Sequence, residues 1–171
     1  DPENRALPVD YGDVCINYDK AWFAEKAIPL PDSLAELADP QYAGLLAVEN
    51  PSTSSPGLAF MLASIAEFGE DGWLDWWQKM KENGVVVTSD WETAYYTNFS
   101  GSSGRGAQPM VVSYASSPAA ELIYAETELR EPPTASLIDA GMCWRQIEFA
   151  GILKGARNRA AAEKFIDFLL S

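Results

Sequence analysis

Three segments of the sequence place serine or threonine side chains where a helix is expected to begin, which suits the binding of an anion or a hydroxylated ligand. They span residues 50–57, 88–92 and 114–118, and each follows a short apolar run. Free backbone N–H groups and the helix dipole favour negative charge at such a position. One segment alone is typical of an ordinary helix cap. Three of them together leave two alternatives open: three ordinary helix caps, or one binding site that the three segments share.

Two aromatic residues lie within these segments and add flat apolar faces to the hydroxyls. Trp91 belongs to the second segment and Tyr114 to the third. Indole and phenol rings supply rigid contact area and an electron-rich face that attracts cations. The candidate hydroxyl groups beside them are those of Ser54, Ser55, Ser116 and Ser117.

The residue inventory argues against catalysis. The chain has no histidine, which excludes Ser-His-Asp and Cys-His nucleophiles and histidine-ligated zinc. Its two cysteines cannot form a four-cysteine metal site. A hydrolase based on Ser116 or Ser117 needs an activating base, and no lysine or carboxylate stands at a suitable spacing. We therefore predict a protein that is not an enzyme and has no metal or cofactor.

Length and charge narrow the class of protein further. A chain of 171 residues is the size of one domain or one lobe of a larger protein. A formal charge of −13 argues against binding to the phosphate backbone of nucleic acids. No apolar run approaches the roughly 20 residues of a membrane span. A nucleic-acid partner and a membrane-spanning segment are therefore not expected.

Cys15 and Cys143 both lie in apolar, strand-like segments far apart in the sequence. In an oxidising compartment they could form a disulfide, whereas in the cytosol they would be buried thiols. The sequence leaves both alternatives open.

Apolar runs alternate with helix-start signals along the chain. Strands are expected at residues 13–18, 44–48, 85–87, 109–114 and 142–152, with helices between and after them. This alternation predicts an α/β fold, a three-layer sandwich with a mainly parallel central sheet. In such a sheet, ligands bind in the crevice outside the carboxyl ends of the strands. The three candidate segments all follow strand ends, so we expect them to converge.

Helix boundaries can be predicted from capping residues. Ser55 is the expected N-cap of a helix whose first residue is Pro56. Ser89 and Glu92 form a capping box that starts the next helix at Trp91. Asn158 is the expected cap of a final amphipathic helix.

Three other patterns concern packing rather than binding. Gly69 and Gly72 are expected to separate two helices, and residues 100–106 are expected to form a flexible surface loop. The helical spacing of four apolar residues predicts a core face, namely Trp73, Trp76, Trp77 and Met80.

The candidate segments extend into longer strings that can be compared with known families. These are VDYG at 9–12 with YDK at 18–20, NPSTSSPGL at 50–58, GEDGW at 69–73, Trp91 with Glu92, Ala94 and Tyr95, VVSYASSPA at 111–119, QIE at 146–148, GILKGA at 151–156 and FIDFL at 165–169. Together they resemble the thiamine-binding extracytoplasmic proteins of bacterial ABC importers. The similarity extends over nearly the whole chain.

The resemblance implies a type 2 periplasmic-binding-protein fold, in which two lobes close on a solute by a hinge. Residues 1–171 would form a single α/β domain, the second lobe, with the first lobe and the C-terminal return segment absent. The implied function is capture of thiamine, thiamine phosphate or thiamine diphosphate and its delivery to an ABC permease. The implied protein is a monomer, periplasmic or anchored as a lipoprotein to the outer face of the cell membrane. A lone lobe offers half a cleft, so we expect it to bind weakly.

The resemblance also implies which residues contact the ligand. Trp91 and Tyr114 would stack on its cationic rings, and the serines with nearby N–H groups would hold its phosphate or hydroxyl groups. Ala120 stands where the family carries another aromatic residue, and Tyr124 could supply that contact instead. Carried over by motif, the ligand-binding residues are Ser54, Ser55, Trp91, Tyr114, Ala115, Ser116, Ser117 and Pro118.

Other ligands and another role remain open within the same fold. Related receptors bind ferric iron through tyrosines, polyamines through acids and aromatics, or small anions. Tyr114 alone does not match the adjacent tyrosine pair expected for iron. A ligand-sensing domain of a signalling protein would use the same lobe.

Overall fold

The computed structural model describes residues 5–103, 105–139 and 141–171. They fall into two compact units: the main unit, residues 13–144, and the terminal unit, residues 5–12 with 145–171. Strands β1 (Leu7–Asp19) and β6 (Trp144–Ala150) each have residues in both units. No helix in the described ranges combines the length and the apolar character that crossing a bilayer requires.

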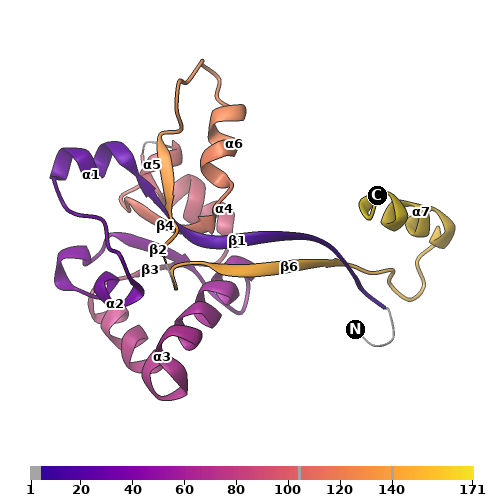
Figure 1. The fold of residues 1–171 in the computed structure, drawn as a ribbon, viewed down its shortest axis with the longest axis horizontal. Helices are drawn as coiled ribbons and strands as arrows, with labels where there is room; N and C mark the ends of the chain where they lie inside the picture. The colour runs from indigo at the N-terminus through magenta and orange to yellow at the C-terminus, as the bar shows by residue number, and fades with distance from the viewer. Residues whose placement is uncertain (1–4, 104, 140) are drawn as a thin grey trace. The chain divides into compact units, whose positions relative to one another are not determined.

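The main unit is built on a sheet with the strand order β3-β2-β4-β1-β5 (Figure 1). β2 pairs in parallel with both β3 and β4, whereas β1 is antiparallel to β4 and to β5. Along this path, four strands therefore run in one direction and only β1 opposes them, so the predicted mainly parallel sheet is confirmed. The four are β2 (Leu46–Glu49), β3 (Val86–Thr88), β4 (Met110–Tyr114) and β5 (Thr134–Leu137).

Helical segments connect these strands in the main unit. They are α1 (Lys20–Lys26), α2 (Leu34–Leu37), the 3-10 turn η1 (Pro40–Tyr42), α3 (Ser55–Glu82), α4 (Trp91–Thr93), the π-helix η2 (Ala94–Asn98), α5 (Ser100–Ser103) and α6 (Ser117–Ile123).

Both faces of the sheet are covered, which gives the three layers that were predicted. Leu46 and Val48 point to one face, where they join a core formed with α2 and α3. Ala47 lies between them on the strand and therefore points to the other face. There it packs with Tyr95 and Phe99 from η2 and the residue that follows it. The burial of β2 on both faces explains why its sequence is a continuous apolar run.

Helix α3 contains the kink and the core face that were predicted. Gly69 adopts φ 70° and ψ 177°, outside helical values, and divides the segment. Beyond it, Trp76 and Met80 are buried in the core, as the spacing predicted. The predicted cap is wrong by one residue, because Ser54 is the N-cap and Ser55 is the first helical residue.

Two further local predictions need correction. The N-cap of α4 is Asp90, whose carboxylate accepts a hydrogen bond from Thr93 N at 2.8 Å. Ser89 instead donates to that carboxylate at 2.6 Å. Residues 100–103 form a short helix and not a flexible loop, and Ser100 Oγ donates to Asp19 Oδ2 at 2.6 Å. A Cβ added at Gly101 would lie 2.5 Å from the Thr134 methyl group, so this turn is closely packed.

Helix α1, the 3-10 turn η1 and strand β5 of the main unit had no sequence prediction. Helix α1 is capped by Asp19, which accepts a hydrogen bond from Trp22 N at 3.1 Å. Strand β5 was missed because its four residues follow a proline-rich connector and carry only a weak alternating pattern. Its role is to extend the sheet beyond β1.

Cys15 and Cys143 are joined by a disulfide. The bond closes a loop of 128 residues and connects β1 to the segment that precedes β6. Both cysteines lie in the main unit. Of the two alternatives left open by the sequence, the structure has the bridged form, which belongs to an oxidising compartment.

The terminal unit contains the pairing of β6 with β1 and the helix α7 (Arg159–Leu169). Asn158 caps α7 by accepting a hydrogen bond from Ala161 N at 3.4 Å, so this predicted cap is confirmed. The apolar stripe of α7 is exposed, since Phe165 and Phe168 keep 59% and 70% of their accessible surface. The predicted strand at 142–152 is shorter than expected, because β6 covers only residues 144–150.

Candidate functional site

The first two candidate segments meet at the carboxyl edge of the sheet. Glu49 and Thr88, the last residues of β2 and β3, are direct partners across the parallel pair. Beyond them, Asn50 N donates to Thr88 O at 2.8 Å. Thr53 Oγ1 donates to Ser89 O at 2.6 Å. The convergence that the strand pattern predicted is therefore present in this part of the sheet.

The third segment joins the second through Trp91. The indole Nε1 of Trp91 donates to Ser113 Oγ at 2.9 Å, and Ser113 is the buried penultimate residue of β4. Ser113 Oγ is also 2.9 Å from the Oγ of Ser117, the first residue of α6. This chain of hydrogen bonds fixes Trp91 over the end of β4.

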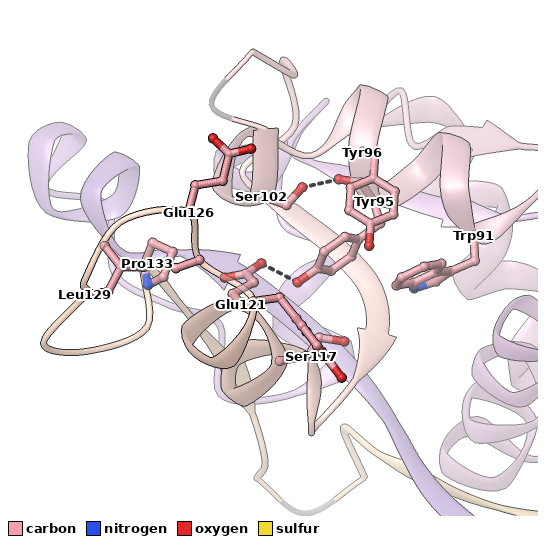
Figure 2. A pocket seen from close by; sticks show the side chains of 12 residues that line it. Trp91, Tyr95, Tyr96, Ser102, Ser117, Glu121, Glu126, Leu129 and Pro133 are labelled. Carbon is pink, nitrogen blue, oxygen red and sulfur yellow. Dashed lines mark hydrogen bonds between the residues drawn. The ribbon is translucent and has the colours of Figure 1, made fainter.

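A cavity of about 370 Å³ opens beside these groups (Figure 2). Trp91 and the two tyrosines of η2 form its aromatic side, α6 contributes polar side chains, and the connector between α6 and β5 completes it. The lining residues are Trp91, Tyr95, Tyr96, Ser102, Ser117, Ala120, Glu121, Tyr124, Ala125, Glu126, Leu129 and Pro133.

The aromatic side of the cavity is held rigidly. The rings of Trp91 and Tyr95 are stacked, with centroids 4.9 Å apart and planes 20° apart. Tyr96 meets Trp91 edge-on, at 5.4 Å between centroids. Tyr95 is buried, whereas Tyr96 is exposed at the mouth of the cavity. This arrangement presents a flat, electron-rich surface to a ligand.

Glu121 is the acidic group of the cavity, and two hydroxyls hold it in place. Tyr95 OH donates to Glu121 Oε1, and Thr134 Oγ1 donates to Oε2 at 2.7 Å (Figure 2 shows the Tyr95 contact). Burial raises the pKa of Glu121 above its usual value, and the two hydroxyl donors oppose this shift. The pKa of the Tyr95 hydroxyl is raised in turn, first by burial and then by Glu121.

The charge of the cavity is negative. Glu121 and Glu126 line it, and no lysine or arginine is among its described lining residues. Two carboxyl groups beside stacked aromatic rings suit a positively charged organic ligand. Among the described residues, no group of three or more acidic or cysteine side chains is placed to hold a metal ion.

The structure brings only some of the predicted site residues to this cavity. Trp91, Ser117 and Tyr124 line it, and Tyr124 is 83% exposed. Of the others, Pro118 is buried and Tyr114 packs against the core. The residues outside the cavity lining are Ser54, Ser55, Tyr114, Ala115, Ser116 and Pro118.

The sequence analysis missed Tyr95, Tyr96 and Glu121. Tyr95 stands four residues after Trp91, and Glu121 stands four residues after Ser117. Residues four apart share a helix face. This spacing from two predicted site residues is the signal that could have found both.

Comparison with solved structures places the fold in one class of proteins. A periplasmic thiamin-binding protein matches with a TM-score of 0.81 and 28% identity, over 98% of this chain and 48% of that one. The fold is also shared by the periplasmic binding protein AfuA of Actinobacillus pleuropneumoniae, solved with fructose-6-phosphate bound, with a TM-score of 0.81 and 21% identity over 98% of this chain and 50% of that one. The main sheet and its helices are thus those of the periplasmic binding proteins.

The chain belongs to the bacterial extracellular solute-binding protein family, whose model matches residues 1–171. Thiamine-binding periplasmic proteins of Brucella suis and Escherichia coli are both 30% identical to it, over 163 and 165 residues. These matches cover 95% and 96% of this chain but 45% and 46% of the relatives, so the chain spans about half their length. The predicted membership among extracytoplasmic solute-binding proteins is thereby confirmed.

Proposed function

We propose that the chain is a ligand-binding lobe of an ABC-importer component that captures thiamine or one of its phosphates and delivers it to a membrane permease. The observation that carries the proposal is the stacked pair of Trp91 and Tyr95 beside the Glu121 carboxyl group, in one cavity at the carboxyl edge of the sheet. The names of the relatives support thiamine as the ligand. Membership in a solute-binding family supports capture without chemical conversion.

The chemistry of thiamine fits the cavity and the loops beside it. Its cationic thiazolium ring matches the aromatic surface at Trp91, and its charge matches Glu121. Phosphate or hydroxyl groups would extend along the sheet edge to Ser54 and Ser55, at the start of the long helix α3. In this arrangement Ala115, Ser116 and Ser117 would contact the ligand between the cavity and α3, with Tyr124 as an additional contact, while Tyr114 and Pro118 pack inward and position this loop.

We further propose that residues 1–171 act as the second lobe of a monomeric, two-lobed receptor. Closure would then bend the chain near residues 9–12 and 146–150. The continuous strands β1 and β6, which both have residues in the two units, support this placement of the hinge. Half of a cleft offers half of the contacts, so the 171-residue chain alone is expected to bind weakly.

Calorimetric titration tests the ligand. Thiamine, thiamine phosphate and thiamine diphosphate are titrated into the 171-residue chain and into a two-lobed protein that contains it. We expect saturable binding by the two-lobed protein and weak or undetectable binding by the chain alone. If the two-lobed protein binds none of the three, thiamine is the wrong ligand. Tight binding by the chain alone would contradict the half-site argument.

Variants test the residues. In the two-lobed protein, Trp91→Ala and Glu121→Gln should each weaken thiamine binding about tenfold or more. Trp91→Phe should retain part of the affinity, because a smaller ring remains. Glu128→Gln is the matched control, an exposed acidic residue of the neighbouring connector that does not line the cavity. If Glu128→Gln and Glu121→Gln lose equal thiamine affinity, the net negative charge of the protein, and not the position of Glu121 in the cavity, is responsible.

A polyamine is the second candidate ligand, and the two carboxyl groups of the cavity favour it. Glu121 and Glu126 could each pair with one ammonium group of an extended polyamine. Spermidine in the same calorimeter separates the two ligands. Ferric iron is disfavoured, because iron ligation requires a tyrosine phenolate. The Tyr95 hydroxyl is instead a hydrogen-bond donor to Glu121, and its raised pKa opposes the loss of its proton.

A further inference from the structure

A second cavity, of about 200 Å³, lies on the other side of β2 from the proposed thiamine site. Residues from the carboxyl end of β2, from both sides of the kink in α3 and from β3 line it. Those used in the argument are Glu49, Met61, Trp73, Trp77 and Val87. The described residues that line the two cavities do not overlap.

Glu49 is the unusual residue of this second cavity. It is only 2% exposed, and neither carboxyl oxygen has a hydrogen-bond partner among the described residues. A buried polar group without a partner is destabilising, and more so if it is charged. Such groups are rare and usually have a functional reason. An apolar side chain would fill this position at lower cost.

Two tryptophans form the aromatic part of the same cavity. Trp77 is fixed by a hydrogen bond from Nε1 to Ser64 Oγ at 2.9 Å and by an edge-on contact with Phe60 at 5.9 Å between centroids. Trp73 lies one helical turn before it and is half-buried. Indole faces attract cations, most strongly where water is excluded.

We propose that this cavity binds a small organic cation that carries N–H groups, such as a protonated primary amine, with Glu49 as its counter-ion and Trp73 and Trp77 as its aromatic wall. Both carboxyl oxygens are covered, so the Glu49 side chain must turn toward the cavity when the cation enters. The cation then supplies the hydrogen-bond donors and the opposite charge that the carboxyl group lacks.

Binding is coupled to the loss of a proton. Burial raises the pKa of Glu49 to about 8, and the Asp90 carboxylate adds to the shift. Glu49 is therefore neutral at pH 7 when the cavity is empty. Asp90 is the charged group that acts on it, and the other lining residues carry no charge. An ammonium ion pairs with the carboxylate, so its binding releases about one proton per site below pH 8.

The experiment uses propylammonium chloride as the probe and the indole N–H signals of the tryptophans in NMR spectra as the readout. We expect saturable shifts at Trp73 and Trp77, together with proton release in calorimetry across buffers of different ionisation enthalpy. The affinity should rise about tenfold from pH 6 to pH 7 and about fivefold from pH 7 to pH 8, where the carboxyl group is already half ionised. Tetramethylammonium chloride, which has no N–H group, should bind more weakly.

Three variants separate this site from general charge and from the thiamine site. Glu49→Gln should abolish proton release and reduce propylammonium affinity at pH 8 at least tenfold, whereas Glu70→Gln, an exposed acid on α3, should change neither. Val87→Trp at the cavity rim should block binding while Glu49 is retained. Glu121→Gln should leave the Trp73 and Trp77 shifts unchanged.

Two results would overturn the proposal. One is the absence of saturable shifts at Trp73 and Trp77. The other is equal, pH-independent binding by the protein and by a folded Glu49→Gln variant. Neither result bears on thiamine, because thiamine binding is tested separately, by calorimetry of the two-lobed protein and its Trp91→Ala and Glu121→Gln variants.

Discussion

Glu121 and Glu49 of the main unit differ in whether other side chains donate hydrogen bonds to their carboxyl groups. Glu121 receives hydrogen bonds from Tyr95 and Thr134 and lines a polar cavity. Glu49 has no hydrogen-bond partner among the described residues and lines an apolar cavity. Burial raises the pKa of both, but hydroxyl donors limit the shift at Glu121.

The comparison teaches which carboxyl group is prepared for a ligand in its charged form. Hydrogen bonds to a carboxylate favour ionisation, so Glu121 is held in position ready to attract a cation. Glu49 is neutral while its cavity is empty, and it loses its proton when a cation binds. The first is a preorganised counter-ion and the second is a proton-coupled one.

The largest effect is expected from Glu49→Gln on the pH dependence of stability. The pKa of Glu49 is about 8 in the folded protein and near 4.5 in the unfolded chain. Between these values the folded state holds a proton that the unfolded state has lost, so stability falls as pH rises, by up to about 1.4 kcal/mol per pH unit. Urea unfolding at pH 5, 6, 7 and 8 should show this slope in the protein and a much smaller one in Glu49→Gln.

Glu121→Gln is the matched control for that experiment. The pKa of Glu121 is also raised, so its contribution has the same sign, but its two donors make it smaller. An equal change of slope in the two variants would remove the distinction between the partnered and the unpartnered carboxyl group.

The next effect concerns the packing of α3 on Glu49. A Cβ added at Gly57 would lie 2.4 Å from Glu49 O and 3.1 Å from Glu49 Cβ. Gly57→Ala must therefore push the helix start away from β2, and we expect a loss of about 2–3 kcal/mol in urea unfolding. Gly72→Ala, farther along α3, meets only Phe68 Cβ at 3.2 Å and should change stability by less than about 1 kcal/mol. If Gly57→Ala loses no more stability than Gly72→Ala, the packing between residue 57 and Glu49 can relax around the added methyl group.

A smaller effect is expected where Glu121 loses one donor. Thr134→Val keeps the shape of the side chain but removes the hydroxyl that donates to Glu121, which should cost about 1–2 kcal/mol and raise the pKa of Glu121 further. Ser136→Ala on the same strand removes a neutral hydrogen bond to Asn17 and should cost less. Carboxyl carbon NMR titration and urea unfolding measure the two quantities. If Ser136→Ala lowers the free energy of unfolding as much as Thr134→Val does, the charge on Glu121 does not strengthen its hydrogen bond with Thr134.

The sequence predicted which segments meet at the carboxyl edge of the sheet, because strands that alternate with helices run in the same direction. β2, β3 and β4 are short apolar runs followed by capped helices, and that order alone brings residues 50–57, 88–92 and 114–118 to the same edge. The choice between neighbouring caps was harder. Ser54 and Ser55, like Ser89 and Asp90, are both competent caps, and tertiary contacts decide between them.

The cavities could not be predicted because they depend on contacts between distant segments. Tyr95 and Glu121 are separated by 26 residues and meet only when η2 packs beside α6. Residues 100–103 have the composition of a flexible loop, yet the contact between Ser100 and Asp19 orders them as a helix. Glu49 follows the predicted strand at 44–48 and had no sequence prediction, and the close approach of Gly57 accompanies its burial.

The smallest effect is expected from Asp90→Asn, which removes the charge of a carboxylate outside the cavity that raises the pKa of Glu49. Asp90 both caps α4 and raises the pKa of Glu49, so Asp90→Ala would mix the loss of a cap with an electrostatic change. Asp90→Asn keeps a good cap and removes only the charge. We expect nearly unchanged stability at pH 5, where Glu49 is neutral, and a pKa of Glu49 that falls but stays above its usual value, because burial is the larger cause. A carboxyl NMR titration in which Asp90→Asn returns Glu49 to an ordinary pKa would show that charge repulsion, and not burial, keeps this side chain neutral.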